Sequence, residues 1–179
     1  LFFEVGAKQI TVVATDGHRL SMSACKQMNT LDGVVKCIIP RKCILEIKRI
    51  LSSFKDNKEN IIDFNITDND FMFKAGDYLI KSKLIEGNYP DYNKVFPESL
   101  PHKLDLNKQD FKSALQRMSI LSNEQFKGVK LSLSESSVTL STNNPSLEEG
   151  EDNISCIYTG DNFDIGFNLT YLLEVIDVI

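Results

Sequence analysis

Asp16, His18 and Arg19 are the residues of this chain whose types and spacing could do chemistry. A carboxylate, an imidazole and a guanidinium this close together could supply a base, its orienting partner and an anion-binding group. No serine sits in a nucleophile elbow, and the sequence holds no P-loop, dinucleotide fingerprint or paired-carboxylate motif. We therefore predict no catalytic residue, and keep a hydrolase or transferase that uses these three residues as an alternative.

Patterns that bind metals are also missing from the sequence. No cysteine belongs to a C-x-x-C pair, and neither His18 nor His102 lies at ligand spacing from a cysteine. The acidic run 148–152 lacks the alternating Asp and Asn residues of a calcium loop. We predict no metal site and no cofactor. The cysteines, which we expect to be reduced thiols, are Cys25, Cys37, Cys43 and Cys156.

The three charged side chains lie in a predicted tight turn. Thr15–Leu20 separates two apolar, strand-like runs, 10–14 and 20–25. Asp-Gly between such runs indicates a hairpin, because glycine reaches positive φ without steric cost. His18 and Arg19 should therefore lie at the end of a strand.

Two kinds of pattern recur along the chain. Alternating apolar residues predict hairpins that start near positions 3, 64 and 131. A short strand followed by a proline or asparagine at a helix start recurs at positions 40, 107 and 168. In both series the third member follows the first by 128 positions. This regularity predicts an α+β fold of repeated helix-plus-antiparallel-strand units, with two units to a domain.

A segment with two prolines and no periodicity, 96–101, marks the expected domain boundary. We assign residues 1–100 to one domain and residues 101–179 to a second. The sequence opens inside a strand pattern without a methionine and stops inside a helical pattern, so we expect both domains to be incomplete.

Basic residues gather on predicted helix faces, although the chain carries a net charge of −5. In the first helix they lie opposite an apolar stripe of Ile44, Ile47 and Leu51. Such faces can attract DNA phosphates without reading sequence, but a solvated helix face gives the same pattern, so both interpretations stay open. The candidates for facing DNA are Arg41, Lys42, Lys48, Arg49, Lys108, Lys112 and Arg117.

The composition, with 42% hydrophobic and 25% charged residues, is that of an ordinary folded protein. No apolar run approaches the roughly 20 residues of a membrane span, and no signal-peptide pattern is present. We expect a cytoplasmic protein without a membrane partner.

Four separated segments resemble the bacterial DNA polymerase III beta subunit, the sliding clamp. They are 14–20 (ATDGHRL), 84–92 (LIEGNYPDY), 120–129 (ILSNEQFKGV) and 165–168 (IGFN), and they follow in the family's order. The resemblance implies the DNA clamp fold, with residues 1–100 in the middle domain and 101–179 in the last of three. It also implies a non-enzymatic processivity factor whose ring encircles duplex DNA.

The same resemblance implies a hydrophobic groove between the middle and last domains. There the DNA polymerase III catalytic subunit, the clamp loader and other replication or repair proteins would insert a short peptide. Lys94 departs from the arginine that could grip a carboxylate with two hydrogen bonds, and the family's C-terminal residues, which finish the groove, are absent. The groove residues implied are Thr15, Gly17, His18, Arg19, Leu20, Pro90, Lys94, Val95, Phe126, Asn168 and Tyr171.

Ile120 and Leu121 would be subunit contacts of a homodimeric ring when the protein is full length. An Ile-Leu pair at a helix end more often belongs to a core, and the partner surface would lie in the missing first domain. A protein-interaction module without a role on DNA stays a second alternative.

Overall fold

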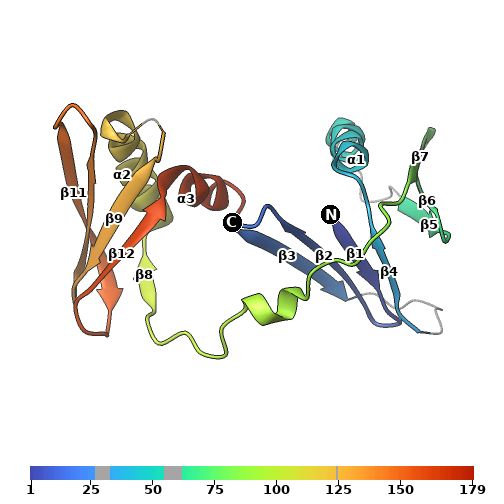
Figure 1. The fold of residues 1–179 in the computed structure, drawn as a ribbon, viewed down its shortest axis with the longest axis horizontal. Helices are drawn as coiled ribbons and strands as arrows, with labels where there is room; N and C mark the ends of the chain where they lie inside the picture. The colour runs from blue at the N-terminus through green and yellow to red at the C-terminus, as the bar shows by residue number, and fades with distance from the viewer. Residues whose placement is uncertain (27–32, 55–61, 124) are drawn as a thin grey trace. The chain divides into compact units, whose positions relative to one another are not determined.

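The computed structural model describes residues 1–26, 33–54, 62–123 and 125–179. The chain divides into two compact units, Leu1–Phe96 and Pro97–Ile179 (Figure 1). Each unit buries a hydrophobic cluster of its own.

The first unit begins with an antiparallel sheet in the order β3-β2-β1-β4. Both faces of the β1–β2 hairpin contribute buried residues: Val5 pairs with Ile10 on one face and Phe2 pairs with Val13 on the other, and all four are buried. The strands are β1 (Phe2–Val5), β2 (Gln9–Thr15), β3 (Leu20–Lys26) and β4 (Val35–Ile38).

Helix α1 (Arg41–Ser53) follows β4 and packs on a second antiparallel sheet of order β5-β6-β7. The buried residues between them include Cys43, Ile50, Phe71 and Phe73. The remaining elements of this unit are β5 (Ile62–Ile66), β6 (Asp70–Ala75), β7 (Tyr78–Lys83) and the 3₁₀ helix η1 (Tyr92–Val95).

The predicted apolar stripe of α1 is wrong at Leu51, which is 38% exposed. Ile44 and Ile47 do pack against the core, but the buried residues of the helix are Cys43 and Ile50. Cys43, Ile47 and Ile50 follow an i, i+4, i+7 spacing, which fits a period of 3.6 residues, and Leu51 lies about 100° around the helix from Ile50.

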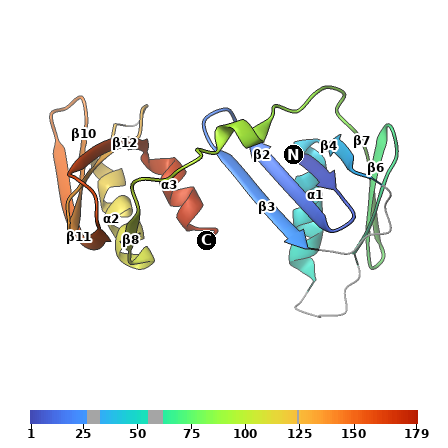
Figure 2. The ribbon, with the colours of Figure 1, turned by 90° about the horizontal axis from the view of Figure 1, so that it is seen from below.

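The second unit is a sheet of order β12-β9-β10-β11-β8 with two helices on one face (Figures 1 and 2). Helix α2 contacts β10, β11 and α3, and its residues Ala114, Leu115 and Met118 enter the core. The elements are β8 (Leu104–Leu106), α2 (Lys108–Leu121), β9 (Gly128–Leu133), β10 (Ser137–Asn143), β11 (Glu149–Tyr158), β12 (Phe163–Asn168) and α3 (Leu169–Ile176).

The α+β class and the repeated units are confirmed. Within the described residues, an antiparallel set of strands followed by a further strand and a helix occurs as β1–β4 with α1, as β5–β8 with α2, and as β9–β12 with α3. The strand before the helix pairs with the first strand of its set in β4–β1 and in β12–β9, whereas β8 pairs with β11.

None of the helices in the described part of the chain combines the length and the apolar character that crossing a bilayer requires.

Candidate functional site

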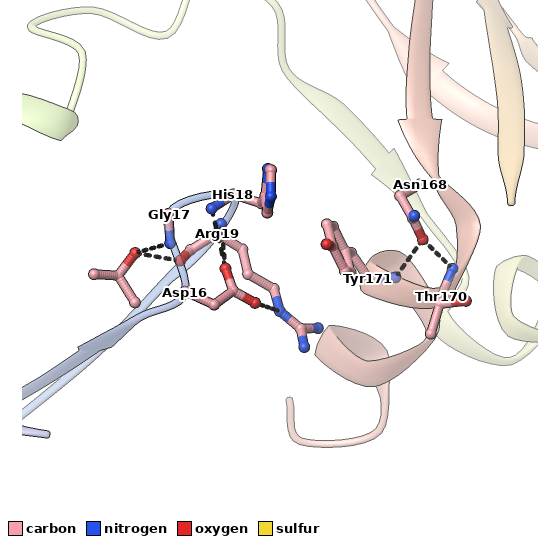
Figure 3. A network of polar contacts seen from close by, with 8 residues as sticks. Asp16, Gly17, His18, Arg19, Asn168, Thr170 and Tyr171 are labelled. Carbon is pink, nitrogen blue, oxygen red and sulfur yellow. Dashed lines mark hydrogen bonds and ion pairs between the residues drawn. The ribbon is translucent and has the colours of Figure 1, made fainter. Parts of the chain in front are cut away.

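The Thr15–Leu20 turn is held by hydrogen bonds among its own residues (Figure 3). Asp16 Oδ1 accepts from the backbone amides of His18 and Arg19, both at 3.0 Å, and Asp16 Oδ2 lies 3.1 Å from Arg19 Nε. Thr15 Oγ1 donates to the Arg19 carbonyl at 2.7 Å. Gly17 has a φ of +89°, and β2 pairs with β3 as far as Thr15 and Leu20. The predicted hairpin is confirmed.

Asp16 is a structural anion in this turn. Its pKa is lowered to about 2, chiefly by the amide hydrogen bonds from His18 and Arg19; desolvation opposes this lowering, and the Arg19 guanidinium adds to it. Both carboxylate oxygens already accept hydrogen bonds. A carboxylate with so low a pKa is a poor base at neutral pH, so Asp16 does not itself suit the role of general base in the chemistry imagined for Asp16, His18 and Arg19.

The segment that follows β7 is fastened to the first sheet. The Ile85 amide donates to the Ile38 carbonyl at 2.9 Å, and the Tyr89 ring stacks on Phe2 with centroids 4.8 Å apart. Pro90 is exposed and lines a depression of about 900 Å³ together with Phe2, Ile85, Tyr89 and other residues of this segment and its sheet.

Lys94 and Val95 belong to η1 and do not line that depression. Lys94 Nζ lies 3.6 Å from Asp91 Oδ2, and Val95 is 64% exposed. An exposed valine beside an exposed cation suits an apolar peptide with a negative group, but a lysine offers only a point charge to such a group.

In the second unit the structure brings Phe126 and Asn168 together. Asn168 is the N-cap of α3: its Oδ1 accepts from the amides of Thr170 at 3.0 Å and Tyr171 at 3.4 Å (Figure 3). Its Nδ2 donates to the Phe126 carbonyl at 3.4 Å. The Phe126 side chain is 68% exposed, and with Asn168 and Phe167 it lines a depression on this unit. Asn168 thus supports the position of Phe126 and the start of α3.

The basic residues of the two helices differ in their partners. All four candidates on α1 are exposed, and only Arg49 makes an ion pair among the described residues, with Glu46 at 2.9 Å. On α2, Lys112 Nζ lies 2.6 Å from Asp177 Oδ1 and Arg117 Nη2 lies 2.5 Å from Asp152 Oδ2. Lys108 donates to the Ile179 carbonyl. The α1 cations are the better placed of the two sets to meet an external anion.

Ile120 and Leu121, the predicted subunit contacts, have different surroundings at the end of α2. Ile120 is 79% exposed. Leu121 is half-buried and approaches Gly150 of β11, where an added Cβ would lie 3.1 Å from Leu121 Cδ1. Ile120 is therefore available for a partner, whereas Leu121 also serves the packing of its own unit.

Sequence reasoning missed Tyr89 and Tyr92 as residues of the candidate site. Both rings contact Phe2, with centroid distances of 4.8 Å and 5.9 Å. The signal was present in the sequence, since the two tyrosines flank Pro90 and Asp91 within the motif 84–92. Aromatic rings that pack in pairs contribute stability beyond their buried area, so both tyrosines help to fix this segment against Phe2.

In the ranges that the structure describes, no cluster of three or more His, Cys, Asp or Glu side chains could hold a metal ion. The cysteines are free thiols, with Cys37 and Cys43 buried, and burial raises the pKa of both. A buried thiol with a raised pKa is a weak nucleophile.

Two family descriptions match consecutive parts of the chain. "DNA polymerase III beta subunit, central domain" matches residues 1–91, and "DNA polymerase III beta subunit, C-terminal domain" matches residues 93–179. Among curated relatives, the beta sliding clamp of Escherichia coli K12 is 35% identical over 179 residues, and that of Salmonella typhimurium LT2 is 36% identical. Each alignment covers 100% of this chain and 48% of the relative, so the chain spans about half the length of these proteins.

Solved structures agree with the sequence relatives. The crystal structure of the DNA polymerase III subunit beta from Pseudomonas aeruginosa matches with a TM-score of 0.93 and 34% identity, covering 99% of this chain and 48% of that one. A sliding clamp from Bartonella birtlesii bound to griselimycin matches with a TM-score of 0.91 and 35% identity, covering 98% of this chain and 47% of that one.

Proposed function

Because the chain belongs to the DNA polymerase III beta subunit family, we propose that it supplies the central and C-terminal domains of a sliding clamp. Residues 1–100 are assigned to the central domain and residues 101–179 to the C-terminal domain. The clamp acts as a processivity factor: its ring encircles duplex DNA and tethers the polymerase without catalysing a reaction. The observation that carries this proposal is the match of both domain descriptions, in order, over nearly the whole chain.

Duplex DNA is contacted through exposed basic helix residues and without sequence preference. Arg41, Lys42 and Lys48 of α1 support this, since they are exposed and no described carboxylate lies within ion-pair distance of them. Contacts to phosphate carry no sequence information, so the protein can slide. The net charge of −5 limits binding elsewhere on the surface.

Partner proteins are captured through a short apolar peptide segment, for which each unit offers candidate residues. Leu20, Pro90 and Val95 of the first unit offer apolar surface, and Arg19 with His18 provides polar groups beside it. Phe126 and Tyr171 of the second unit add aromatic surface. We expect the DNA polymerase III catalytic subunit, the clamp loader and other replication or repair proteins to bind here, and griselimycin to bind as it does to the Bartonella relative.

The full-length protein forms a homodimeric ring in the cytoplasm, with Ile120 at the subunit contact. An isoleucine that is 79% exposed at a helix end supports this role.

The test is fluorescence-anisotropy binding of a labelled polymerase-tail peptide to the full-length protein, comparing wild type with Leu20→Ala plus Val95→Ala. Removing two apolar side chains from the binding surface should reduce the affinity for the peptide by at least about tenfold. Leu79→Ala, at a side chain on β7 that is 69% exposed, is the matched control and should bind as wild type does. Absence of saturable binding by the wild-type protein would contradict the proposal.

The two alternatives predict different results. A hydrolase or transferase would lose turnover on His18→Ala, and the low pKa of Asp16 and its two occupied oxygens argue against that carboxylate as its base. A protein-interaction module without a DNA role would show no change in DNA binding when Lys42→Glu and Arg49→Glu are combined.

A further inference from the structure

Three aromatic rings of the first unit join its peptide-site elements. The Tyr89 ring stacks on Phe2 at 4.8 Å with an interplanar angle of 17°, and the Tyr92 ring lies 5.9 Å from Phe2 at 53°. Phe2 is only 8% exposed, so the rings of Tyr89 and Tyr92 rest on a fixed platform in β1. We refer to Phe2, Tyr89 and Tyr92 as the aromatic brace.

Tyr89 also reaches the strand that leads into the Thr15–Leu20 turn. Its Oη donates to the Val13 carbonyl at 3.4 Å. Burial raises the pKa of Tyr89, and a hydrogen bond from the Thr15 backbone opposes this only in part, so the hydroxyl stays protonated and keeps its donor. Val13 pairs with Phe2 at the start of β1, and Thr15 lies beyond that pairing. The Tyr89 hydroxyl therefore bonds β2 at Val13, the last residue of β2 that pairs with β1.

Pro90 follows Tyr89 directly in the chain, and Tyr92 is the first residue of the helix that carries Lys94 and Val95. Through the hydrogen bond from Tyr89 to Val13, the brace therefore connects two stretches of the chain. One is β2 with its turn, and the other is the segment that presents Pro90 and Val95. Those stretches are far apart in sequence, since 76 positions separate Tyr89 from Val13. Neither tyrosine is needed to close a sheet, because the strand pairs of this unit do not include them.

We propose that Tyr89, braced on Phe2 and bonded to Val13, is a positioning residue for peptide binding that sets Pro90 and Val95 relative to the Thr15–Leu20 turn. This inference rests on the proposed function. A binding surface assembled from two stretches keeps its affinity only if they hold their spacing, and a misplacement of about 1 Å can reduce binding or rate strongly. Tyr89 need not touch the peptide to act in this way.

The experiment measures binding of griselimycin and of a labelled polymerase-tail peptide to the full-length protein by calorimetry and anisotropy. Tyr89→Leu, which removes both the stacking and the hydroxyl, should reduce the affinity for both ligands by about tenfold. Tyr89→Phe keeps the ring and loses only the hydrogen bond, so it should recover most of that affinity and remain within about threefold of wild type. The matched control is Tyr78→Leu, at a half-exposed tyrosine of β7 that packs on Phe54, and should leave both affinities unchanged.

A purely structural role is separated from positioning by two further readouts. The unfolding temperature of Tyr89→Leu should fall no more than that of Tyr78→Leu, and the salt dependence of duplex DNA binding should match wild type. Wild-type affinity in Tyr89→Leu would overturn the inference, whereas Tyr89→Phe binding as poorly as Tyr89→Leu would support it and assign the effect to the hydrogen bond with Val13. If the wild-type protein bound neither ligand, the proposed function itself would fail, which is a different result.

Discussion

Asp16 stabilises its turn as a carboxylate that remains ionised well into the acid range. Its pKa in the folded chain is about 2, below the roughly 3.9 of an unfolded aspartate. A group with a depressed folded pKa stabilises the fold above its unfolded pKa, and this contribution is lost as the pH falls through the folded value. The turn should therefore weaken only in acid.

We predict that Asp16→Asn lowers the unfolding temperature by a constant amount between pH 7 and pH 5. The difference from wild type should shrink from about pH 4 toward pH 2, because the wild-type carboxylate then becomes neutral as well. Thermal unfolding followed by circular dichroism at each pH tests this, with Asp63→Asn at an exposed position of β5 as the control for net charge. A difference that stays the same at every pH would show that the ionised form of Asp16 is not what holds the turn.

We expect Lys94 to limit the affinity of the proposed peptide site for a peptide that carries a carboxylate. Its ammonium lies 3.6 Å from Asp91, and an arginine could offer two parallel donors in its place. We predict that Lys94→Arg strengthens binding of a peptide with an acidic residue by about two- to fivefold. Anisotropy with that peptide and with its amide counterpart measures the effect, and an equal gain for both peptides would rule out carboxylate recognition.

At the scale of elements, α1 and α2 both carry several basic residues, but these residues differ in how many form ion pairs within the protein. Lys112 and Arg117 tie α2 to Asp177 and to β11 within the second unit. Surface ion pairs of this kind stabilise a protein by roughly 0–1 kcal/mol. DNA phosphates can therefore compete for Lys112 and Arg117, but these ion pairs must first be broken. Arg41, Lys42 and Lys48 of α1 have no such ion pair to break among the described residues.

Two variants that each remove three positive charges test this difference. We predict that Arg41→Gln, Lys42→Gln and Lys48→Gln together reduce the slope of log affinity against log salt for duplex DNA by about two to three. The matched set on α2, Lys108→Gln, Lys112→Gln and Arg117→Gln, should reduce it by less than about one. Equal reductions of the slope in the two variants would show that the ion pairs of α2 do not prevent its basic side chains from contacting phosphate.

The sequence predicts elements whose signals are local. Asp16-Gly17 predicts the β2–β3 turn because both residues act within it, and the α+β repeat follows from periodic apolar residues. The stripe of α1 is wrong at Leu51 because two phases of a short helix fit the apolar residues, and only packing on β6 and β7 selects one.

The interactions that position the candidate sites cannot be read from the sequence in the same way. Arg117 and Asp152 are 35 positions apart, and Tyr89 and Val13 are 76 apart. Such pairs depend on how strands and helices pack, which no spacing rule in the sequence determines. The motif 84–92 identifies the segment that carries candidate site residues. Only the fold shows that Tyr89 attaches this segment to Phe2 and Val13.

At the scale of the whole molecule, the proposal requires a closed ring. We predict that Ile120→Asp converts the full-length protein from dimer to monomer, because a charge at an apolar subunit contact cannot be desolvated without a partner. Light scattering after size exclusion should show the mass fall by half. Leu147→Asp, at a side chain that is 91% exposed in the β10–β11 loop, is the control and should remain dimeric. A dimeric Ile120→Asp would place the subunit contact elsewhere.

The most direct test of the central claim is the length of DNA made in a single encounter between polymerase and primed template. The reaction contains the DNA polymerase III catalytic subunit and clamp loader, with or without the full-length protein. A processivity clamp predicts products that are many times longer when the protein is present, and a return to short products with Leu20→Ala plus Val95→Ala. Products of the same length with and without the wild-type protein would contradict the account.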